Sequence, residues 1–195
     1  MLRYFVSKNH GFVLRKEIDT DTNEYRYIIT RDSNSVIVKT YTVGTILSSV
    51  RTSANWYKNN CYKQYKQINW TVFLCYDTES YTYAISQFNS DDWKDFRKTI
   101  AGNRRTTIVD MASIADIEDT MLLDLDGVCK YLETPNCAIP NGSKGKVKMK
   151  KLFRDNGQTY HEGERARYLI DSLDKETVIR KSSIPFHKIE TACFK

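Results

Sequence analysis

Apolar and polar residues alternate along the first 43 residues as they do in β-strands. Successive side chains of a strand point to opposite faces, so a half-buried strand shows an apolar residue at every second position. The alternating apolar positions are Leu2, Tyr4, Val6, Phe12, Leu14, Tyr25, Tyr27, Ile29, Val36 and Val38. The intervening segments 19–24 and 31–35 are rich in Asp, Asn, Ser and Thr, which favour turns. This region is therefore predicted to form two hairpins or a meander.

The spacing of apolar residues changes after Thr45. From there they recur at intervals of three and four, as on one face of a helix, at Ile46, Leu47, Val50, Ala54 and Tyr57. A helix is predicted from this point to about Lys66. Residues 70–88 return to the strand pattern, with a short polar turn at 78–80, which predicts a hairpin.

Two more helices and a short strand are predicted between residues 89 and 132. Asn89 or Ser90 would cap a helix that Gly102 ends, because polar caps satisfy free amides and glycine suits helix C-termini. A short strand is expected at 106–109. Ser113 would cap the next helix, whose apolar stripe comprises Ile117, Met121, Leu122, Leu125, Val128, Cys129 and Leu132.

The stretch 133–146 holds two prolines and two glycines, which regular elements do not tolerate. It predicts a linker between a body at 1–138 and a C-terminal module at 139–195. Four short strands are predicted in that module, at 146–155, 163–172, 176–182 and 185–190, and so few short strands bury a core by curling into a barrel. The expected fold class is α+β: a mixed body of antiparallel hairpins and about three helices, followed by a small β-barrel.

The C-terminal segment resembles SH3-like barrels of the broad KOW type. The resemblance covers about a quarter of the chain and rests on Tyr160, Gly163, Ala166, Tyr168, Ile184 and Ile189. It lacks the early glycine-centred signature of a true KOW segment. SH3-like barrels bind nucleic acids in some proteins and peptides in others, so the resemblance implies a binding module. The Tyr- and Asn-rich chain as a whole is similar to small bacteriophage proteins that redirect host machinery.

Positive charge gathers at the end of the chain. The net charge is +6, and residues 144–195 hold 13 Lys and Arg against 7 Asp and Glu, whereas residues 1–143 hold 17 of each. Lys144, Lys146, Lys148, Lys150 and Lys151 would project from one side of a strand and follow a phosphate backbone. The alternative is an edge strand that lysines protect against unwanted pairing. Further phosphate contacts are expected from Arg165, Arg167, Arg180 and Lys181.

A second basic segment lies in the body, where residues 51–70 contain no acid. Lysines alternate there with aromatic residues, in the order Trp56, Tyr57, Lys58, Tyr62, Lys63, Tyr65, Lys66 and Trp70. Such rings can stack on bases while cations contact phosphates, and Tyr62 and Tyr65 are the candidate stacking residues. Alternatively, the tyrosines pack on the core and the lysine stems lie along the surface. Arg104 and Arg105, in a predicted loop, would add a phosphate contact.

Acidic residues gather between 110 and 133, which hold seven acids and one lysine. Asp116, Glu118, Asp119, Asp124 and Asp126 predict either a surface for a basic protein partner or the ordinary solvent face of a helix. Asp77 and Glu79, followed by Asp91 and Asp92, raise the alternative of a magnesium-dependent nuclease, although turn and cap roles explain them as well.

No metal ion or other cofactor is expected. The three histidines, His10, His161 and His187, lie far apart, no cysteine pair has CxxC spacing, and the GxGxxG, GxxxxGK[ST] and GxSxG motifs are absent. Five cysteines cannot all pair within one chain, which favours a reducing compartment. The sequence has neither the apolar core of a signal peptide nor an apolar stretch near membrane-spanning length, so the protein is expected in the cytoplasm. If the protein is viral, the expected location is the host cytoplasm.

The sequence therefore predicts a non-enzymatic protein that binds DNA or RNA mainly through phosphates, as a regulator of host or phage nucleic-acid machinery. Two alternatives remain open at this point. One is an inhibitor or adaptor that binds a host enzyme without nucleic acid, and the other is the metal-dependent nuclease.

Overall fold

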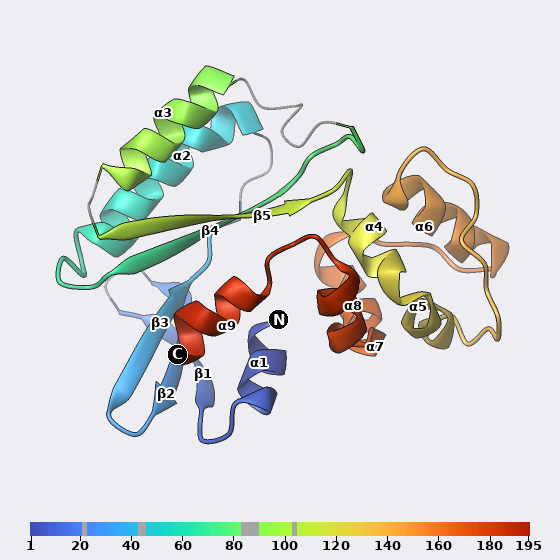
Figure 1. Ribbon diagram of the computed structural model, residues 1–195, viewed down its shortest axis with the longest axis horizontal. Coiled ribbons are helices and arrows are strands. Elements are labelled where there is room, and N and C mark those ends of the chain that lie inside the picture. Colours follow the sequence, from blue (N-terminus) through green and yellow to red (C-terminus); the bar gives the residue numbers. More distant parts are fainter. Residues whose placement is uncertain (21–22, 43–45, 83–89, 103–104) are drawn as a thin grey trace. The chain divides into compact units, whose positions relative to one another are not determined.

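The structure is a computed structural model that describes residues 1–195 except 21–22, 43–45, 83–89 and 103–104. The fold is mixed α+β, as predicted (Figure 1). The chain divides into two compact units: unit 1 comprises residues 1–73, 88–109 and 187–195, and unit 2 comprises residues 74–87 and 110–186. The sequence-predicted boundary between 138 and 139 lies inside unit 2. No helix in the described ranges is long and apolar enough to cross a membrane.

Unit 1 contains the predicted meander. Strands β1 (Val13–Asp19), β2 (Glu24–Arg31) and β3 (Asn34–Lys39) form an antiparallel sheet in the order β1-β2-β3. Leu14 pairs with Ile29, which pairs with Val36, so the alternating apolar residues share one face. The strand predicted at residues 2–6 is wrong, because Leu2–Lys8 form helix α1. Leu2, Tyr4 and Val6 alternate, but Leu2, Phe5 and Val6 also have helical spacing, and the buried residue of this helix is Phe5.

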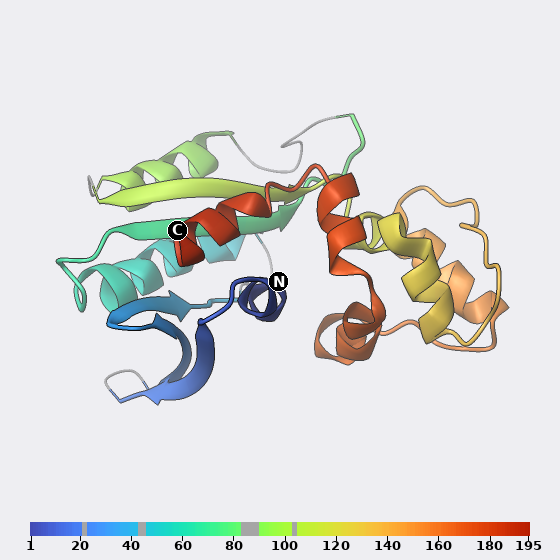
Figure 2. The same cartoon turned by 60° about the horizontal axis from the view of Figure 1, so that its bottom comes forward.

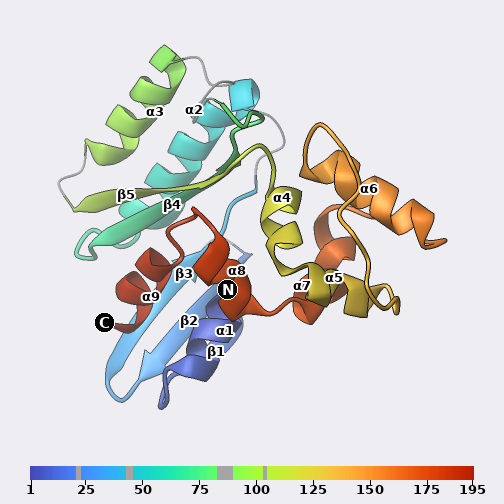
Figure 3. The ribbon, with the colours of Figure 1, turned by 45° about the vertical axis from the view of Figure 1, so that its right-hand side comes forward.

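The two predicted helices of unit 1 are confirmed. Helix α2 (Ile46–Tyr57) continues into the π-helical turn η1 (Lys58–Tyr62), and α3 (Ser90–Ala101) ends at Gly102. The two helices pack side by side (Figures 1 and 3). Asn89, the alternative cap, lies outside the described residues. The C-terminal helix α9 (His187–Phe194) also belongs to this unit, where the Phe194 ring lies 5.0 Å from that of Phe12.

Strands β4 (Trp70–Asp77) and β5 (Thr106–Ser113) form a second sheet, and each begins in unit 1 and ends in unit 2. The Trp70 amide donates to the Arg105 carbonyl at one end, and the Thr78 amide donates to the Ser113 carbonyl at the other, so the strands are parallel. Strand β4 therefore pairs with β5, whereas the predicted hairpin would pair it with residues 81–88. Most of the second strand of that hairpin, residues 83–88, lies outside the described residues.

Unit 2 is helical beyond these strands. The stripe at 117–132 forms α4 (Ile117–Met121), the 3-10 turn η2 (Leu122–Asp124) and α5 (Leu125–Tyr131), with Asp116 rather than Ser113 as the N-cap. There follow α6 (Gly145–Asp155), the 3-10 turn η3 (Gly163–Ala166), α7 (Arg167–Ser172) and α8 (Lys175–Lys181). Figure 3 shows α4 and α6 close together, in agreement with their contacts.

The four strands predicted after residue 145 are wrong, since helices α6 to α9 occupy that region. The described residues after Ser113 contain no strand, so they form no SH3-like barrel. The physical reason is visible in α6. Its lysines alternate with apolar residues, but its buried residues are Gly145, Met149, Leu152 and Phe153, at offsets of 0, 4, 7 and 8. This is the spacing of a helix face.

A disulfide joins Cys129 of α5 to Cys137 in the irregular segment before α6, with Cα atoms 5.8 Å apart. Cys61, Cys75 and Cys193, all of them described, form no disulfide. A search for CxxC spacing could not find this pair, because eight residues separate its members. Disulfides persist mainly in oxidising surroundings, so this bond does not support the expected reducing compartment.

Candidate nucleic-acid interface

The net charges of the two folded units differ from those of the sequence segments 1–143 and 144–195. Unit 1 contains 18 Lys and Arg against 9 Asp and Glu, a net charge of +9. Unit 2 contains 12 Lys and Arg against 15 Asp and Glu, a net charge of −3. The lysine-rich segment 144–151 thus belongs to a unit with an excess of acid, and the larger positive field originates in unit 1.

The first three lysines of the predicted phosphate-binding row are engaged within unit 2. Lys144 pairs with Glu79, Lys146 Nζ lies 2.7 Å from Glu162 Oε2, and Lys148 Nζ lies 2.9 Å from Asp119 Oδ1. Lys148 also donates to the Tyr81 hydroxyl at 2.8 Å. Hydrogen bonds to these partners raise the pKa of all three lysines. Their charge is therefore compensated inside the unit.

The other predicted cations of unit 2 are spread over several elements. Lys150 Nζ lies 3.4 Å from Glu162, Lys151 is half-buried on α6, and Arg165 is exposed on η3. Arg167 lies 3.8 Å from Asp171 on α7. Arg180 is exposed on α8, and Lys181 donates to the Leu123 carbonyl at 2.9 Å. No single strand aligns these side chains, because α6, η3, α7 and α8 carry them.

The acidic residues predicted as a partner surface face inward. Asp116 accepts from the amides of Asp119 and Lys146, and Asp119 accepts from the Gly145 amide at 2.7 Å. These carboxylates compensate the positive end of the α6 dipole. Burial favours a higher pKa for Asp119, but hydrogen bonds from Tyr81, Lys148 and the Gly145 amide outweigh it and lower that pKa.

The remaining acids of this group are also engaged, except one. The Tyr160 hydroxyl donates to Glu118 at 2.8 Å, and burial together with this bond raises the pKa of Tyr160. Asp124 accepts from the Gly127 and Asp174 amides at 3.3 and 2.5 Å. Asp126 is exposed. A protein partner at these acids stays a prediction, but four of the five carboxylates have internal roles.

Asp77 and Glu79 lie at the end of β4, as a metal-dependent nuclease would require. Burial raises the pKa of Asp77 to about 6, and the neighbouring charges of Glu118 and Asp116 contribute. Glu79 is paired with Lys144. The part of the chain that the structure describes contains no group of three or more His, Cys, Asp or Glu side chains arranged to hold a metal ion. The side chains of Asp91 and Asp92 lie outside this description.

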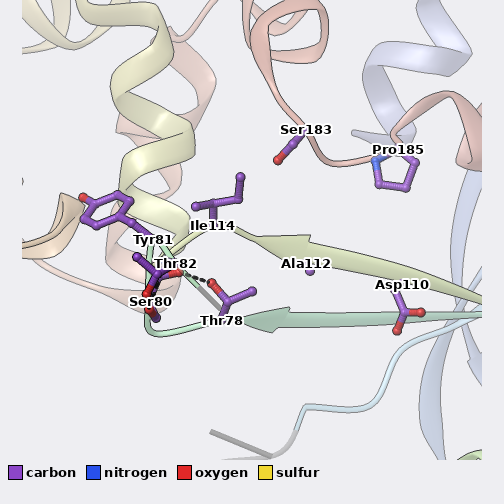
Figure 4. Close-up of a pocket in the computed structure, with 9 residues that line it drawn as sticks. All are labelled: Thr78, Ser80, Tyr81, Thr82, Asp110, Ala112, Ile114, Ser183 and Pro185. Atoms are coloured by element: carbon purple, nitrogen blue, oxygen red, sulfur yellow. Dashed lines mark hydrogen bonds between the residues drawn. The ribbon is translucent and has the colours of Figure 1, made fainter. Parts of the chain in front are cut away.

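A hollow of about 380 Å³ lies in unit 2 beside the end of β4. Figure 4 shows Ser183 and Pro185 on one side and Thr78 and Asp110 on the other. The Thr78 hydroxyl donates to the Ser80 carbonyl and accepts from the Ala115 amide, both at 2.9 Å. This threonine is thus used within the unit, and the hollow lacks a convergent set of charged groups.

Unit 1 brings together two acid-free segments. The chain contains no Asp or Glu in residues 33–76 or 96–109. The Arg105 guanidinium donates to the Lys66 carbonyl at 2.8 Å and to Gln67 Oε1 at 3.2 Å, and its carbonyl accepts from the Trp70 amide. These bonds join the end of the second segment to the end of the first. We use the name basic edge for five exposed cations that these two segments carry, Lys58, Lys63, Lys66, Lys98 and Arg105.

The five residues of the basic edge are exposed, and the charge of its four lysines is not compensated by any described carboxylate. Among the described residues, no carboxylate lies within ion-pair distance of Lys58, Lys63, Lys66 or Lys98. Arg104, the other arginine predicted here, lies outside the described residues. The π-helical turn, closed by a bond from the Lys63 amide to the Lys58 carbonyl, presents two of the lysines. Such turns are frequent at functional sites.

A buried ion pair anchors this segment to the sheet. Lys39 Nζ lies 2.6 Å from Asp19 Oδ2, with the side chains 4% and 1% exposed, and it also donates to the Asn60 carbonyl at 2.8 Å. The Tyr65 hydroxyl accepts from Arg26 at 2.7 Å, and its ring lies 6.0 Å from that of Trp70. Tyr65 is therefore a packing residue. Tyr62, the other predicted stacking residue, is half-buried.

Comparisons with family models, curated proteins and solved structures find no match. Function must therefore be argued from the site itself. The sequence indicated Lys58, Lys63, Lys66 and Arg105 as candidate phosphate contacts, and all four are exposed in unit 1, but it did not indicate Lys98. The sequence signal that could have indicated Lys98 is the acid-free stretch 96–109. Counting charged residues over the whole of residues 1–143 did not reveal this stretch.

Proposed function

We propose that the protein binds nucleic acid through phosphate contacts made by the basic edge of unit 1. The observation that carries the proposal is the meeting of two acid-free segments on a unit of net charge +9. Exposed lysines without carboxylate partners are available to neutralise phosphates. When they do so, cations condensed on the nucleic acid are released, and this release drives binding.

Binding by this mechanism is expected to show little sequence specificity. Lysine ammonium groups contact phosphate oxygens, which carry no base information, and Arg105 contributes a planar group beside them. The anchored π-helical turn holds Lys58 and Lys63 in place before binding, so fewer side chains must be ordered on association. We propose that the biological role of this binding is the regulation of host or phage nucleic-acid machinery.

The test is a titration with labelled duplex DNA, single-stranded DNA and RNA at salt concentrations from about 50 to 300 mM. The slope of log K against log salt reports the number of phosphates contacted. A K58A/K63A/K66A variant is expected to lose about 0.9 of slope per lysine on duplex DNA and about 0.7 on single strands.

A matched control removes the same charge from unit 2. The K150A/K151A/R154A variant changes three cations of α6 and is expected to keep most of the wild-type affinity. Equal losses in the two variants would show a response to total charge rather than a site. Binding that salt does not weaken, or no binding of any nucleic acid at the lowest salt, would contradict the proposal.

A further inference from the structure

The two faces of the β1-β2-β3 sheet carry different charges. Side chains alternate along each strand and paired residues share a face, so the register assigns every residue to one side. The acids of these strands, Glu17, Asp19 and Glu24, all lie on one face. The other face carries Lys16 and Arg31 as its only charged residues, together with apolar and aromatic side chains, Leu14, Ile18, Tyr25, Tyr27, Ile29, Val36 and Val38.

One end of this acid-free face is covered and the other is open. At the covered end Ile29 is 1% exposed, and the Arg31 guanidinium lies 4.6 Å from the centre of the Phe12 ring. At the open end Ile18 is 53% exposed and Tyr25 is 59% exposed, and these two residues pair directly. In Figure 2 the end of β1 lies away from helices α1 and α9. We define the open face as Lys16, Ile18, Tyr25 and Tyr27.

Aromatic and cationic groups are combined on the open face. Lys16 Nζ lies 3.8 Å from the centre of the Tyr25 ring, and Tyr27 is the cross-strand partner of Lys16. An exposed tyrosine offers a large ring at low cost in conformational entropy. With no carboxylate among the strand residues of this face, in a unit of net charge +9, this ring favours a polyanionic ligand that also has apolar faces.

We infer that the open face binds unpaired bases of single-stranded nucleic acid, with one base stacked on Tyr25 and Lys16 contacting the adjacent phosphate. The inference rests on the proposed function and specifies its substrate class. Bases within a duplex are already stacked on one another and do not present a free ring face, whereas single strands stack readily on exposed aromatic side chains. The basic edge attracts either form, and the open face adds affinity for the unpaired one.

The experiment compares a labelled oligo(dT) single strand of about 12 nucleotides with a duplex of equal length. Tyr25→Ala is expected to weaken single-strand binding about tenfold and to leave duplex binding unchanged, because it removes a stacking ring but no charge. Tyr25→Phe retains the ring and is expected to bind as the wild type does. Tyr168→Ala removes a tyrosine of α7 in unit 2 that is 75% exposed, more than Tyr25, and is expected to change nothing.

The outcomes separate this inference from the proposed function. If the wild type binds neither oligonucleotide, both fail. If K58A/K63A/K66A abolishes binding but Tyr25→Ala binds the single strand as tightly as the wild type, the basic edge stands and the open face does not. Equal losses of single-strand and duplex binding in Tyr25→Ala would also overturn base stacking.

Discussion

Asp77 has an unusual environment for a carboxylate. It is half-buried at the end of β4, and burial, with the nearby Glu118, Asp116 and Glu79, raises its pKa to about 6. In the unfolded chain its pKa is near the ordinary value of about 4. Between these values the folded state binds the additional proton, so the contribution of Asp77 to stability decreases as pH rises from about 4 to 6.

Replacing Asp77 by Asn should remove this penalty and retain an oxygen that accepts the Ile117 amide. At about pH 7.5 the free energy of unfolding is expected to increase by about 1–2 kcal/mol. At about pH 3 most of this difference should disappear, since Asp77 is then mostly protonated in both the folded and the unfolded state. Urea denaturation at both pH values measures the difference. A difference that does not change with pH would contradict this account of Asp77.

At the scale of elements, the contact of α4 with the N-terminus of α6 depends on a glycine. A Cβ at position 145 would clash with the backbone of Asp119 and with the carboxylate of Asp116. The same two residues accept the amides of Gly145 and Lys146. Any side chain at position 145 would therefore separate the carboxylates from the helix end that they stabilise.

Gly145→Ala is expected to lower the free energy of unfolding by about 2–4 kcal/mol, because rigid backbone must move and two buried hydrogen bonds weaken. Ser143→Ala, at an exposed neighbouring position, is the control and should change stability by less than about 0.5 kcal/mol. Thermal or urea denaturation of both variants measures the effect. A Gly145→Ala protein as stable as Ser143→Ala would show that α4 and α6 are not in this contact.

The elements that the sequence predicted share one property: a single periodicity. Strands β1 to β3 alternate without competing helical spacing, and α2 repeats at three and four residues. Helix α6 has both signals, and the alternation of lysines concealed the buried stripe that includes Met149 and Phe153. The ammonium groups of surface lysines stay in solvent in helices and strands alike. The spacing of lysines therefore carries little information on secondary structure.

The candidate site was predictable where it depends on composition alone. The absence of acid around Lys58, Lys63 and Lys66 is a property of the sequence, and among the described residues no carboxylate pairs with these lysines in the fold. The neutralisation of Lys144 and Lys148 was not predictable, because their partners Glu79 and Asp119 are 65 and 29 residues away. Pairing at such separations follows from the crossover topology of β4 and β5, which the sequence pattern did not show.

At the scale of the whole molecule, we propose that unit 1, and not the lysine-rich helix of unit 2, binds nucleic acid. The net charges of +9 and −3 give the two units opposite electrostatic tendencies toward phosphate. The lysines of α6 have the higher density in the sequence, but those of the basic edge lack carboxylate partners among the described residues. Binding should therefore follow uncompensated charge.

Hydrogen–deuterium exchange of the intact chain, with and without a saturating oligo(dT) single strand, tests this claim most directly because it locates the contact. The account predicts slower exchange in peptides from residues 58–66 and 98–105, and from the strands that carry Lys16 and Tyr25, with no change in residues 145–155. Protection confined to residues 145–155, or no protection in unit 1, would contradict it.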